Sequence, residues 1–198
     1  MPRVNNKDFF AEQIKHYGDD VKSVNWGSIE SQHKRFEIII EYLDDIEHAT
    51  LVDAGCGLGD FYDFLTQHNM LPKEYIGLDI TTEMIHHARQ KFPQLQFLET
   101  NILEDALPKA DYYIASGSLN MLTYPSTYKF IQKCFEQSNK KFIFNILSTH
   151  ATFFDHGYNY MSPSELLANC MRLTSNVSLR HDYLSHDFTI VMNKEFQR

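Results

Sequence analysis

LVDAGCGLG, at residues 51–59, decides the fold of this chain. Its opening LVDA is a short apolar run of the kind that forms a buried strand, and three alternate glycines follow it. Phe61, Phe64 and Leu65 then recur at spacings of three and four, as apolar residues do on an amphipathic helix. The glycines therefore join a strand to a helix.

The same alternation of strand and helix extends along the rest of the chain. Such alternation is the signature of a parallel sheet with helices packed on it. The last two β-rich runs, Val177–Tyr183 and Phe188–Asn193, are separated only by Leu184–Asp187, which suits an antiparallel hairpin. We therefore expect an α/β fold whose sheet is parallel except at one edge. The expected strands are Leu51–Ala54, Tyr75–Ile80, Leu95–Glu99, Asp111–Ala115 and Lys141–Leu147, and the expected helices are Ser31–Leu43, the one after the glycines, Thr82–Phe92, Ser126–Gln137 and one from Ser162 to about Met171.

Composition limits the class of protein. The 198 residues, 43% of them hydrophobic, suit one domain, in which residues 1–48 form an N-terminal helical cap or lid over a core of residues 49–198. A net charge of -8 opposes binding to nucleic acid, and no apolar stretch is long enough to cross a bilayer. Cys56, Cys134 and Cys170 lie too far apart for a zinc knuckle or a disulfide framework. We expect a cytoplasmic protein and leave its oligomeric state open.

The glycine turn is expected to lie at a ligand site. In an open parallel sheet, ligands bind beyond the carboxyl ends of the strands, where glycines let them approach the main chain. A dinucleotide fingerprint needs its third glycine one position later, where this chain has Asp60. A carboxylate at the start of a helix competes with the phosphate of such a ligand. The turn therefore favours a cationic nucleoside cofactor without phosphate, and a tight connection that binds nothing is the alternative.

Asp79 is a second candidate for cofactor binding. It ends the expected second strand, about twenty residues after the last glycine, which is the spacing of ribose recognition in this type of sheet. Its carboxylate can accept hydrogen bonds from both ribose hydroxyls. The alternative is that Asp79 caps the helix that begins near Thr82, and both roles can coexist.

These residues resemble the motifs of the class I S-adenosylmethionine-dependent methyltransferases. LVDAGCGLG is similar to that family's first motif and IGLD, at residues 76–79, to its second, and the likeness runs from about Thr50 to Ser148. The resemblance implies a Rossmann-like three-layer sandwich with a mostly parallel seven-stranded sheet and an antiparallel C-terminal hairpin strand beside the fifth. It implies S-adenosylmethionine as cofactor and S-adenosylhomocysteine as product. An Asn-Pro-Pro-Tyr type of motif is absent, which counts against bases and glutamine as acceptors.

The resemblance also implies how the cofactor is held. Its methionine part would lie against the glycine turn, its ribose at the end of the second strand, and its adenine against the loop after the third. The transferred methyl group would lie beside the stretch that follows the fourth strand. Asn101 stands where the family often has an acid that contacts the adenine amine. The cofactor-binding residues implied in this way are Asp53, Ala54, Gly55, Cys56, Gly57, Gly59, Asp79, Ile80, Asn101, Ile102, Ser116 and Gly117.

The acceptor side carries no comparable motif. Methyl transfer from a sulfonium is an in-line displacement, so the protein chiefly aligns the acceptor and excludes water. Residues 150–161, rich in Phe and Tyr, are predicted to line the acceptor site, and a surface loop packed by its aromatics is the alternative. His150 is the candidate general base, with a packing or surface role as its alternative. Arg35, in an early segment from Tyr17 to Phe36 that could fold over the cofactor, is the candidate partner of the cofactor's carboxylate, with a solvated helix arginine as its alternative.

We expect no metal. The pairs His181–Asp182 and His186–Asp187 invite a metal site, but strand alternation places neighbours on opposite faces and a hairpin turn explains the polarity. The expected function is methyl transfer to a small-molecule acceptor. The alternatives are an S-adenosylmethionine-binding module without transfer activity and a nicotinamide-dependent oxidoreductase built on the same type of sheet.

Overall fold

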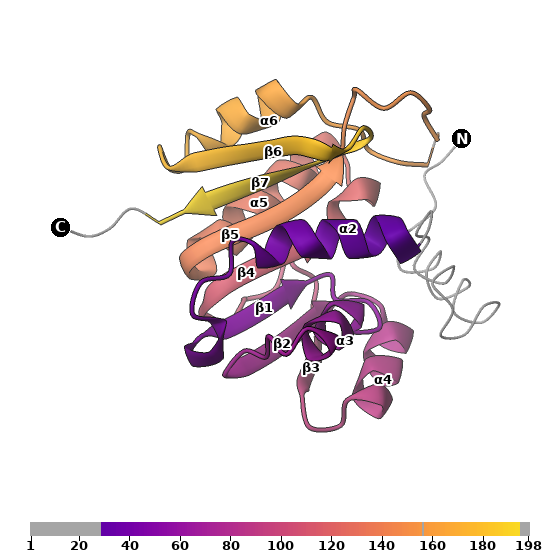
Figure 1. Cartoon of the computed structure of the whole chain (residues 1–198), viewed down its shortest axis with the longest axis vertical. Helices are drawn as coiled ribbons and strands as arrows, with labels where there is room; N and C mark the ends of the chain where they lie inside the picture. The colour runs from indigo at the N-terminus through magenta and orange to yellow at the C-terminus, as the bar shows by residue number, and fades with distance from the viewer. Residues whose placement is uncertain (1–28, 156, 195–198) are drawn as a thin grey trace.

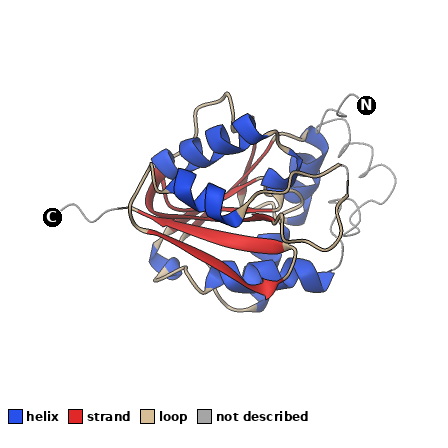
Figure 2. Cartoon of the chain, turned by 90° about the horizontal axis from the view of Figure 1, so that it is seen from above, coloured by secondary structure: helices blue, strands red, loops and turns tan. Residues whose placement is uncertain are grey.

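A central sheet covered by helices on both faces gives the protein three layers (Figures 1 and 2). The computed structural model describes residues 29–155 and 157–194. Within them the expected Rossmann-like α/β sandwich is confirmed. The first part of the expected N-terminal cap, including Tyr17, lies outside the described residues.

The sheet has seven strands in the order β3-β2-β1-β4-β5-β7-β6. Strands β1 to β5 run parallel, whereas β7 pairs antiparallel with both β5 and β6. The antiparallel strand beside the fifth is thus confirmed. The strand order reverses between β1 and β4, and this is the switch point at which such sheets bind ligands. The strands are β1 (Thr50–Ala54), β2 (Glu74–Asp79), β3 (Gln96–Glu99), β4 (Ala110–Ser116), β5 (Ser138–Leu147), β6 (Val177–Leu184) and β7 (Asp187–Asn193).

The helices divide between the two faces of the sheet. One apolar core holds Phe36, Phe64 and Ile85 from α2, α3 and α4, and the other holds Phe130 and Leu166 from α5 and α6. No helix among the described residues has the length and apolar character needed to span a membrane. The helices are α2 (Ile29–Ile40), α3 (Asp60–Gln67), α4 (Thr82–Lys91), α5 (Tyr124–Gln137) and α6 (Pro163–Cys170), with the short 3-10 helices η2 (Ile46–His48) and η3 (Ser118–Met121).

Capping residues set the start of two helices. The Ser162 side chain accepts a hydrogen bond from the Glu165 backbone N–H at 3.4 Å, which confirms the expected start of α6. Helix α5 begins at Tyr124, before the expected Ser126, because the Thr123 hydroxyl accepts a bond from the Ser126 N–H at 3.3 Å. The sequence therefore predicts both helices but locates only one cap.

The glycine turn adopts the backbone for which glycine is needed. Gly55, Gly57 and Gly59 have φ of 87°, 53° and 82°, in the left-handed region that disfavours side chains. A Cβ at Gly55 would lie 2.2 Å from the Cβ of Ser118, which follows β4. The space freed at Gly55 is thus occupied by the segment after β4, so this glycine brings the two neighbouring strand ends together.

Candidate functional site

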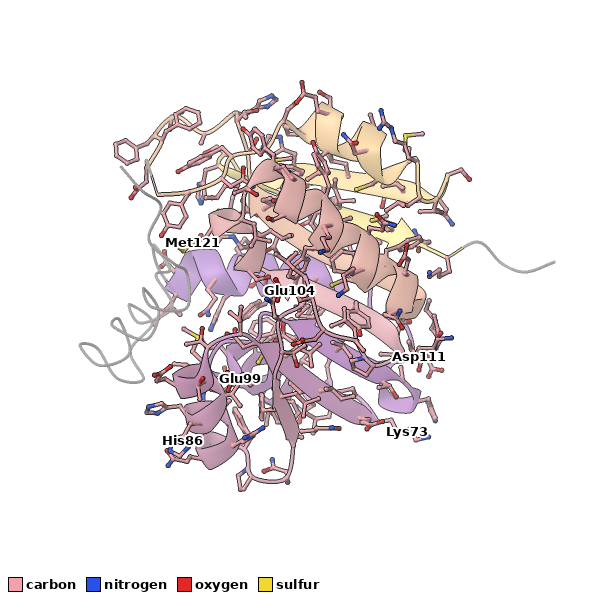
Figure 3. All side chains as sticks on the ribbon, turned by 180° about the vertical axis from the view of Figure 1, so that it is seen from behind. Lys73, His86, Glu99, Glu104, Asp111 and Met121 are labelled. Carbon is pink, nitrogen blue, oxygen red and sulfur yellow. The ribbon has the colours of Figure 1, made fainter. Side chains whose placement is uncertain are left out.

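A cavity of about 330 Å³ lies at the carboxyl ends of β1, β2 and β4. Figure 3 shows its lining residue Met121 at one end of the sheet, with Lys73 and Asp111 at the other. The cavity therefore occupies the edge where parallel sheets bind ligands. Nine residues with a predicted role in cofactor binding line it: Asp53, Gly55, Cys56, Asp79, Ile80, Asn101, Ile102, Ser116 and Gly117.

Ala54, Gly57 and Gly59, also predicted for the cofactor, do not line this cavity. Their backbone groups organise its wall. The Ala54 carbonyl accepts a bond from the Ser118 hydroxyl at 2.8 Å, and the Gly59 N–H donates to the Cys56 carbonyl at 2.9 Å. Their direct contact with a cofactor stays a prediction.

The carboxylate of Asp79 connects the first two strand ends. One oxygen accepts the Gly57 N–H at 3.0 Å, and the other accepts the Thr81 N–H at 2.9 Å. Asp79 is 9% exposed and lines the cavity, and burial raises its pKa. Each carboxylate oxygen has a second lone pair, so these bonds leave capacity for two ribose hydroxyls. The capping alternative is realised in part through Thr81, and the ribose role stays a prediction.

The glycine turn uses its own amides internally. Gly55 and Cys56 donate their N–H groups to the Leu78 carbonyl at 2.7 and 3.0 Å, and Gly57 donates to Asp79. A phosphate-binding turn needs such N–H groups free to point at the ligand. A dinucleotide site presents free backbone N–H donors to its ligand. This turn instead presents the Asp79 carboxylate.

Asp53 is buried behind the turn. The Tyr75 hydroxyl donates to it at 2.6 Å, and Asp53 is 3% exposed. Burial, the largest cause, and the charges of Asp79 and Asp60 raise the pKa of Asp53 to about 7, against the lowering effect of the Tyr75 bond. Three carboxylates thus surround the space above the glycine turn, which suits a cationic ligand.

Between pH 4 and pH 8 we expect the native chain to lose roughly 4 kcal/mol of unfolding free energy through Asp53, and we expect Asp53→Asn to be spared this loss. The folded pKa of Asp53, about 7, lies above its ordinary value of 3.8. Between those values the folded state keeps a proton that the unfolded state releases, so native stability falls as pH rises. Asparagine does not titrate, and its carbonyl still accepts the Tyr75 bond. Urea unfolding of both chains across this pH range is the measurement, and parallel curves would contradict the buried titration.

The adenine side of the site is built by the ends of β2 and β3. Ile80 is 38% exposed at the cavity, where an apolar side chain can cover a flat ring. The Asn101 side-chain oxygen accepts the Leu103 N–H at 3.1 Å, which fixes the orientation of its amide. Contact of either residue with adenine stays a prediction.

Arg35 is engaged inside the protein. It is 4% exposed, its Nε donates to an oxygen of the fully buried Asp187 at 2.7 Å, and it does not line the cavity. The Tyr183 hydroxyl donates to the other oxygen of Asp187 at 2.7 Å. The alternative of a solvated helix arginine is wrong because Arg35 is buried, and its pairing with the cofactor's carboxylate stays a prediction.

His150, the candidate base, is exposed and does not line the cavity. Its ring centroid lies 5.2 Å from that of His181, on β6. Asp182, next to His181, pairs with Arg180 at 2.7 Å. The structure thus places His150 beside the hairpin, away from the glycine turn, and its role as a base stays a prediction.

Several lining residues were not singled out by the sequence. Asn120, Met121 and Leu122, in or just after η3, line the cavity. Tyr158 also reaches it, from the loop 150–161 that the sequence predicts to line the acceptor site. The structure identifies Asn120 because its side chain is buried and its side-chain oxygen accepts the Leu147 N–H at 3.1 Å. Its position after a strand-ending Ser-Gly was the one available signal.

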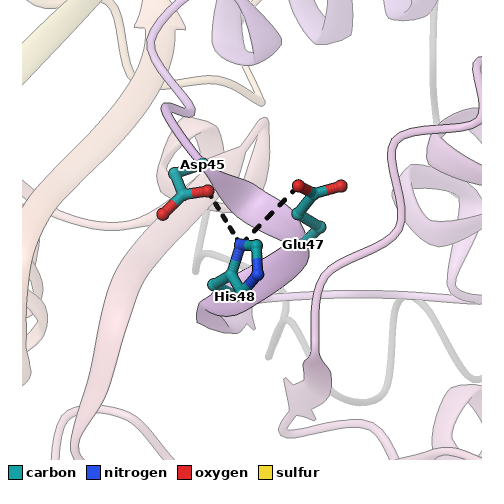
Figure 4. Close-up of side chains that lie close together, drawn as sticks. All are labelled: Asp45, Glu47 and His48. Carbon is teal, nitrogen blue, oxygen red and sulfur yellow. Dashed lines mark hydrogen bonds and ion pairs between the residues drawn. The ribbon is translucent and has the colours of Figure 1, made fainter.

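One cluster among the described residues has the composition of a metal site. Asp45, Glu47 and His48 are exposed, with His48 Nδ1 2.9 Å from a carboxylate oxygen of Asp45 and 3.6 Å from one of Glu47 (Figure 4). The cluster precedes β1, so it lies at the opposite edge of the sheet from the cavity. It contributes nothing to the candidate site.

Comparisons with known proteins agree on one type of domain. Residues 51–140 match the family model of a methyltransferase domain. The chain is 28% identical over 152 residues to the protein Rv1506c of Mycobacterium tuberculosis, whose assignment as a methyltransferase is itself provisional, and the match covers 72% of this chain and 91% of that protein.

Solved structures share the fold at low identity. Magnesium protoporphyrin IX methyltransferase from Synechocystis PCC 6803, solved with bound SAH, is 14% identical and superposes with a TM-score of 0.73 over 96% of this chain and 98% of that one. The DhpI-SAM-HEP complex is 12% identical, with a TM-score of 0.72 over 97% and 100%. A SAM-dependent methyltransferase from Archaeoglobus fulgidus is 15% identical, with a TM-score of 0.66 over 85% and 95%.

Proposed function

We propose that this chain is a class I S-adenosylmethionine-dependent methyltransferase, which transfers the methyl group of S-adenosylmethionine to a small-molecule acceptor. The observation that carries the proposal is the glycine turn. Its N–H groups at Gly55, Cys56 and Gly57 are bonded internally, and the carboxylates of Asp53 and Asp79 lie beside it. That arrangement repels phosphates and attracts a cation.

The donor set fits the cofactor. Asp79 has the capacity for two hydroxyl hydrogen bonds, and Ile80 and Ile102 offer apolar surface to adenine. Asp60 offers negative charge to an ammonium or sulfonium, and Asp53 does so above its pKa of about 7. When bound, the cofactor supplies an electrophilic methyl group. The chain's own task is then to orient the acceptor and exclude water. Met121, Leu122 and Tyr158 are placed to do so, because they line the cavity on the side away from β3.

A small acceptor is favoured by charge. The chain carries a net charge of -8, and among the described residues no Lys or Arg lines the cavity. A phosphate backbone would be repelled at the entrance.

Three buried free cysteines support a reducing compartment, and we infer a cytoplasmic location.

Calorimetry with S-adenosylhomocysteine tests the cofactor assignment. We expect binding in the micromolar range or tighter, which corresponds to about 8 kcal/mol, and no binding of NAD⁺. Binding of NAD⁺ with no binding of S-adenosylhomocysteine would favour the oxidoreductase instead. Transfer of a labelled methyl group into a fractionated extract of small metabolites then separates an enzyme from a binding module without activity.

A further inference from the structure

We propose that a second cavity, formed by the aromatic loop and the start of α5, holds the uncharged, planar aromatic part of the methyl acceptor. This cavity has a volume of about 440 Å³ and shares Tyr158 with the cofactor cavity. The inference rests on the proposed function, because it names the class of acceptor for that site.

The two cavities are neighbours, because they share a lining residue and adjoin along the chain. The wall of the cofactor cavity includes Asn120, Met121 and Leu122, and the next residues along the chain, Thr123 and Tyr124, line the second cavity. Tyr158 forms part of both walls. A molecule in the second cavity therefore approaches the cofactor from the end of β4, where the methyl group is expected.

The aromatic loop is fixed to the fold at its base. Asn159, 3% exposed, donates its N–H to the Asn120 carbonyl and its side-chain amide to the Thr127 hydroxyl at 3.0 Å. The Thr149 N–H donates to the Met161 carbonyl at 3.0 Å, which closes the loop. The second cavity is thus a built feature, because both ends of its wall are bonded to the sheet and to α5.

The hydroxyls of the aromatic wall are used within the loop. The Tyr124 hydroxyl donates to the Tyr160 carbonyl at 3.1 Å, and the Tyr160 hydroxyl accepts the Asp155 N–H at 3.0 Å. The ring of Phe154 meets that of Tyr160 edge to face, with centroids 4.8 Å apart. Phe154 is nevertheless 49% exposed and Tyr124 56% exposed. The wall therefore presents ring faces and edges, which bind other flat rings.

The charge of the residues that line the second cavity favours an uncharged ring over an anionic one. Every described residue that lines the second cavity is uncharged. The charges that act on Tyr158 are the Asp155 carboxylate and, more weakly, the Arg35 guanidinium, which is already paired with Asp187. An anionic acceptor would lose its hydration there without gaining a cationic partner. Burial raises the pKa of Tyr158 to about 12, so its hydroxyl stays protonated and can position a nucleophile without serving as a base.

A phenol or a heteroaromatic hydroxyl satisfies these conditions. Its oxygen would form the new bond to the methyl carbon as the carbon–sulfur bond breaks. The sulfur would keep the electron pair and become a thioether, and the hydroxyl proton would pass to water. No further reactant is needed. The ring stabilises the oxygen anion, so the hydroxyl proton is lost easily as the new bond forms and a strong general base is unnecessary.

The test measures binding of 2-naphthol by calorimetry to protein saturated with S-adenosylhomocysteine. We expect 2-naphthol to bind at least tenfold more tightly than 2-naphthoate, which adds charge, and than decahydro-2-naphthol, which removes planarity. Phe154→Ala should weaken 2-naphthol roughly five- to tenfold and leave S-adenosylhomocysteine affinity unchanged. Phe153→Ala is the matched control, because Phe153 is adjacent and 80% exposed but lines neither cavity, and it should change neither affinity.

Failure of this proposal is distinct from failure of the proposed function. Absence of 2-naphthol binding, equal binding of the naphthoate, or an unchanged affinity in Phe154→Ala would each overturn the aromatic subsite while S-adenosylhomocysteine still bound. Absence of S-adenosylhomocysteine binding would instead overturn the cofactor assignment on which the subsite depends.

Discussion

Replacing Arg35 with methionine is expected to lower the free energy of unfolding by about 3 to 5 kcal/mol, because it leaves Asp187 charged, buried and without its cation. The two side chains are 5% and 0% exposed, and 2.7 Å separates Nε from the carboxylate oxygen. The only other side-chain partner of Asp187 among the described residues is the Tyr183 hydroxyl. One hydroxyl compensates a buried carboxylate poorly. Urea unfolding measures the loss.

Two further variants separate the buried pair from general damage. Lys34→Met removes the neighbouring cation, which is 45% exposed and pairs with Glu37, and should leave the free energy of unfolding nearly unchanged. Arg35→Met combined with Asp187→Leu removes both charges and should recover most of the loss, since buried pairs are often replaceable by apolar residues. If the double variant were no more stable than Arg35→Met, the ion pair would not be the cause. The affinity of the double variant for S-adenosylhomocysteine also tests whether Arg35 contacts the cofactor's carboxylate.

Replacing Asp79 with alanine is expected to weaken S-adenosylhomocysteine binding by about 3 kcal/mol, or roughly a hundredfold in Kd. The change removes the acceptor of both expected ribose bonds, each made to a charged oxygen. It also frees the Gly57 and Thr81 N–H groups that Asp79 now accepts, which loosens the turn. Calorimetry of the folded variant gives the number.

Asp63→Ala is the matched control for Asp79→Ala. Asp63 is an aspartate of α3 that pairs with Lys91 at 3.2 Å, is 44% exposed, and lines neither cavity. It should bind S-adenosylhomocysteine as tightly as the native chain. A native affinity in Asp79→Ala, with the circular dichroism spectrum retained, would refute the ribose role.

Local patterns predicted most of the fold. Every expected strand and helix within the described residues is present, because each carries a clear apolar period bounded by glycine, proline or capping residues. The observed ends of helices and strands differ from the expected ones where a short-range hydrogen bond sets them. The final hairpin turn, expected over Leu184–Asp187, shrinks to residues 185–186 because Leu184 and Asp187 already pair as strand residues.

The candidate site was predictable where it depends on strand ends and less so elsewhere. Asp53 and Asp79 follow from register, since both lie in the last two residues of parallel strands that pair side by side. The Arg35–Asp187 bond joins residues 152 positions apart, and no spacing in the sequence encodes such a contact. Asn120 lies in the short helix η3 and Tyr158 in the loop 150–161, and the path of both segments depends on bonds formed only after the sheet has assembled.

The position of β7 has a consequence for how the chain acquires its structure during synthesis. This strand lies between β5 and β6 but is made after both, so an emerging chain holds β5 with one edge unpaired until residues 187–193 are available. That edge displays Phe142, Ile143 and Phe144, a run with high tendency to pair with strands of other molecules. Partly synthesised or truncated chains therefore expose an edge prone to intermolecular strand pairing, which the finished fold covers with β7.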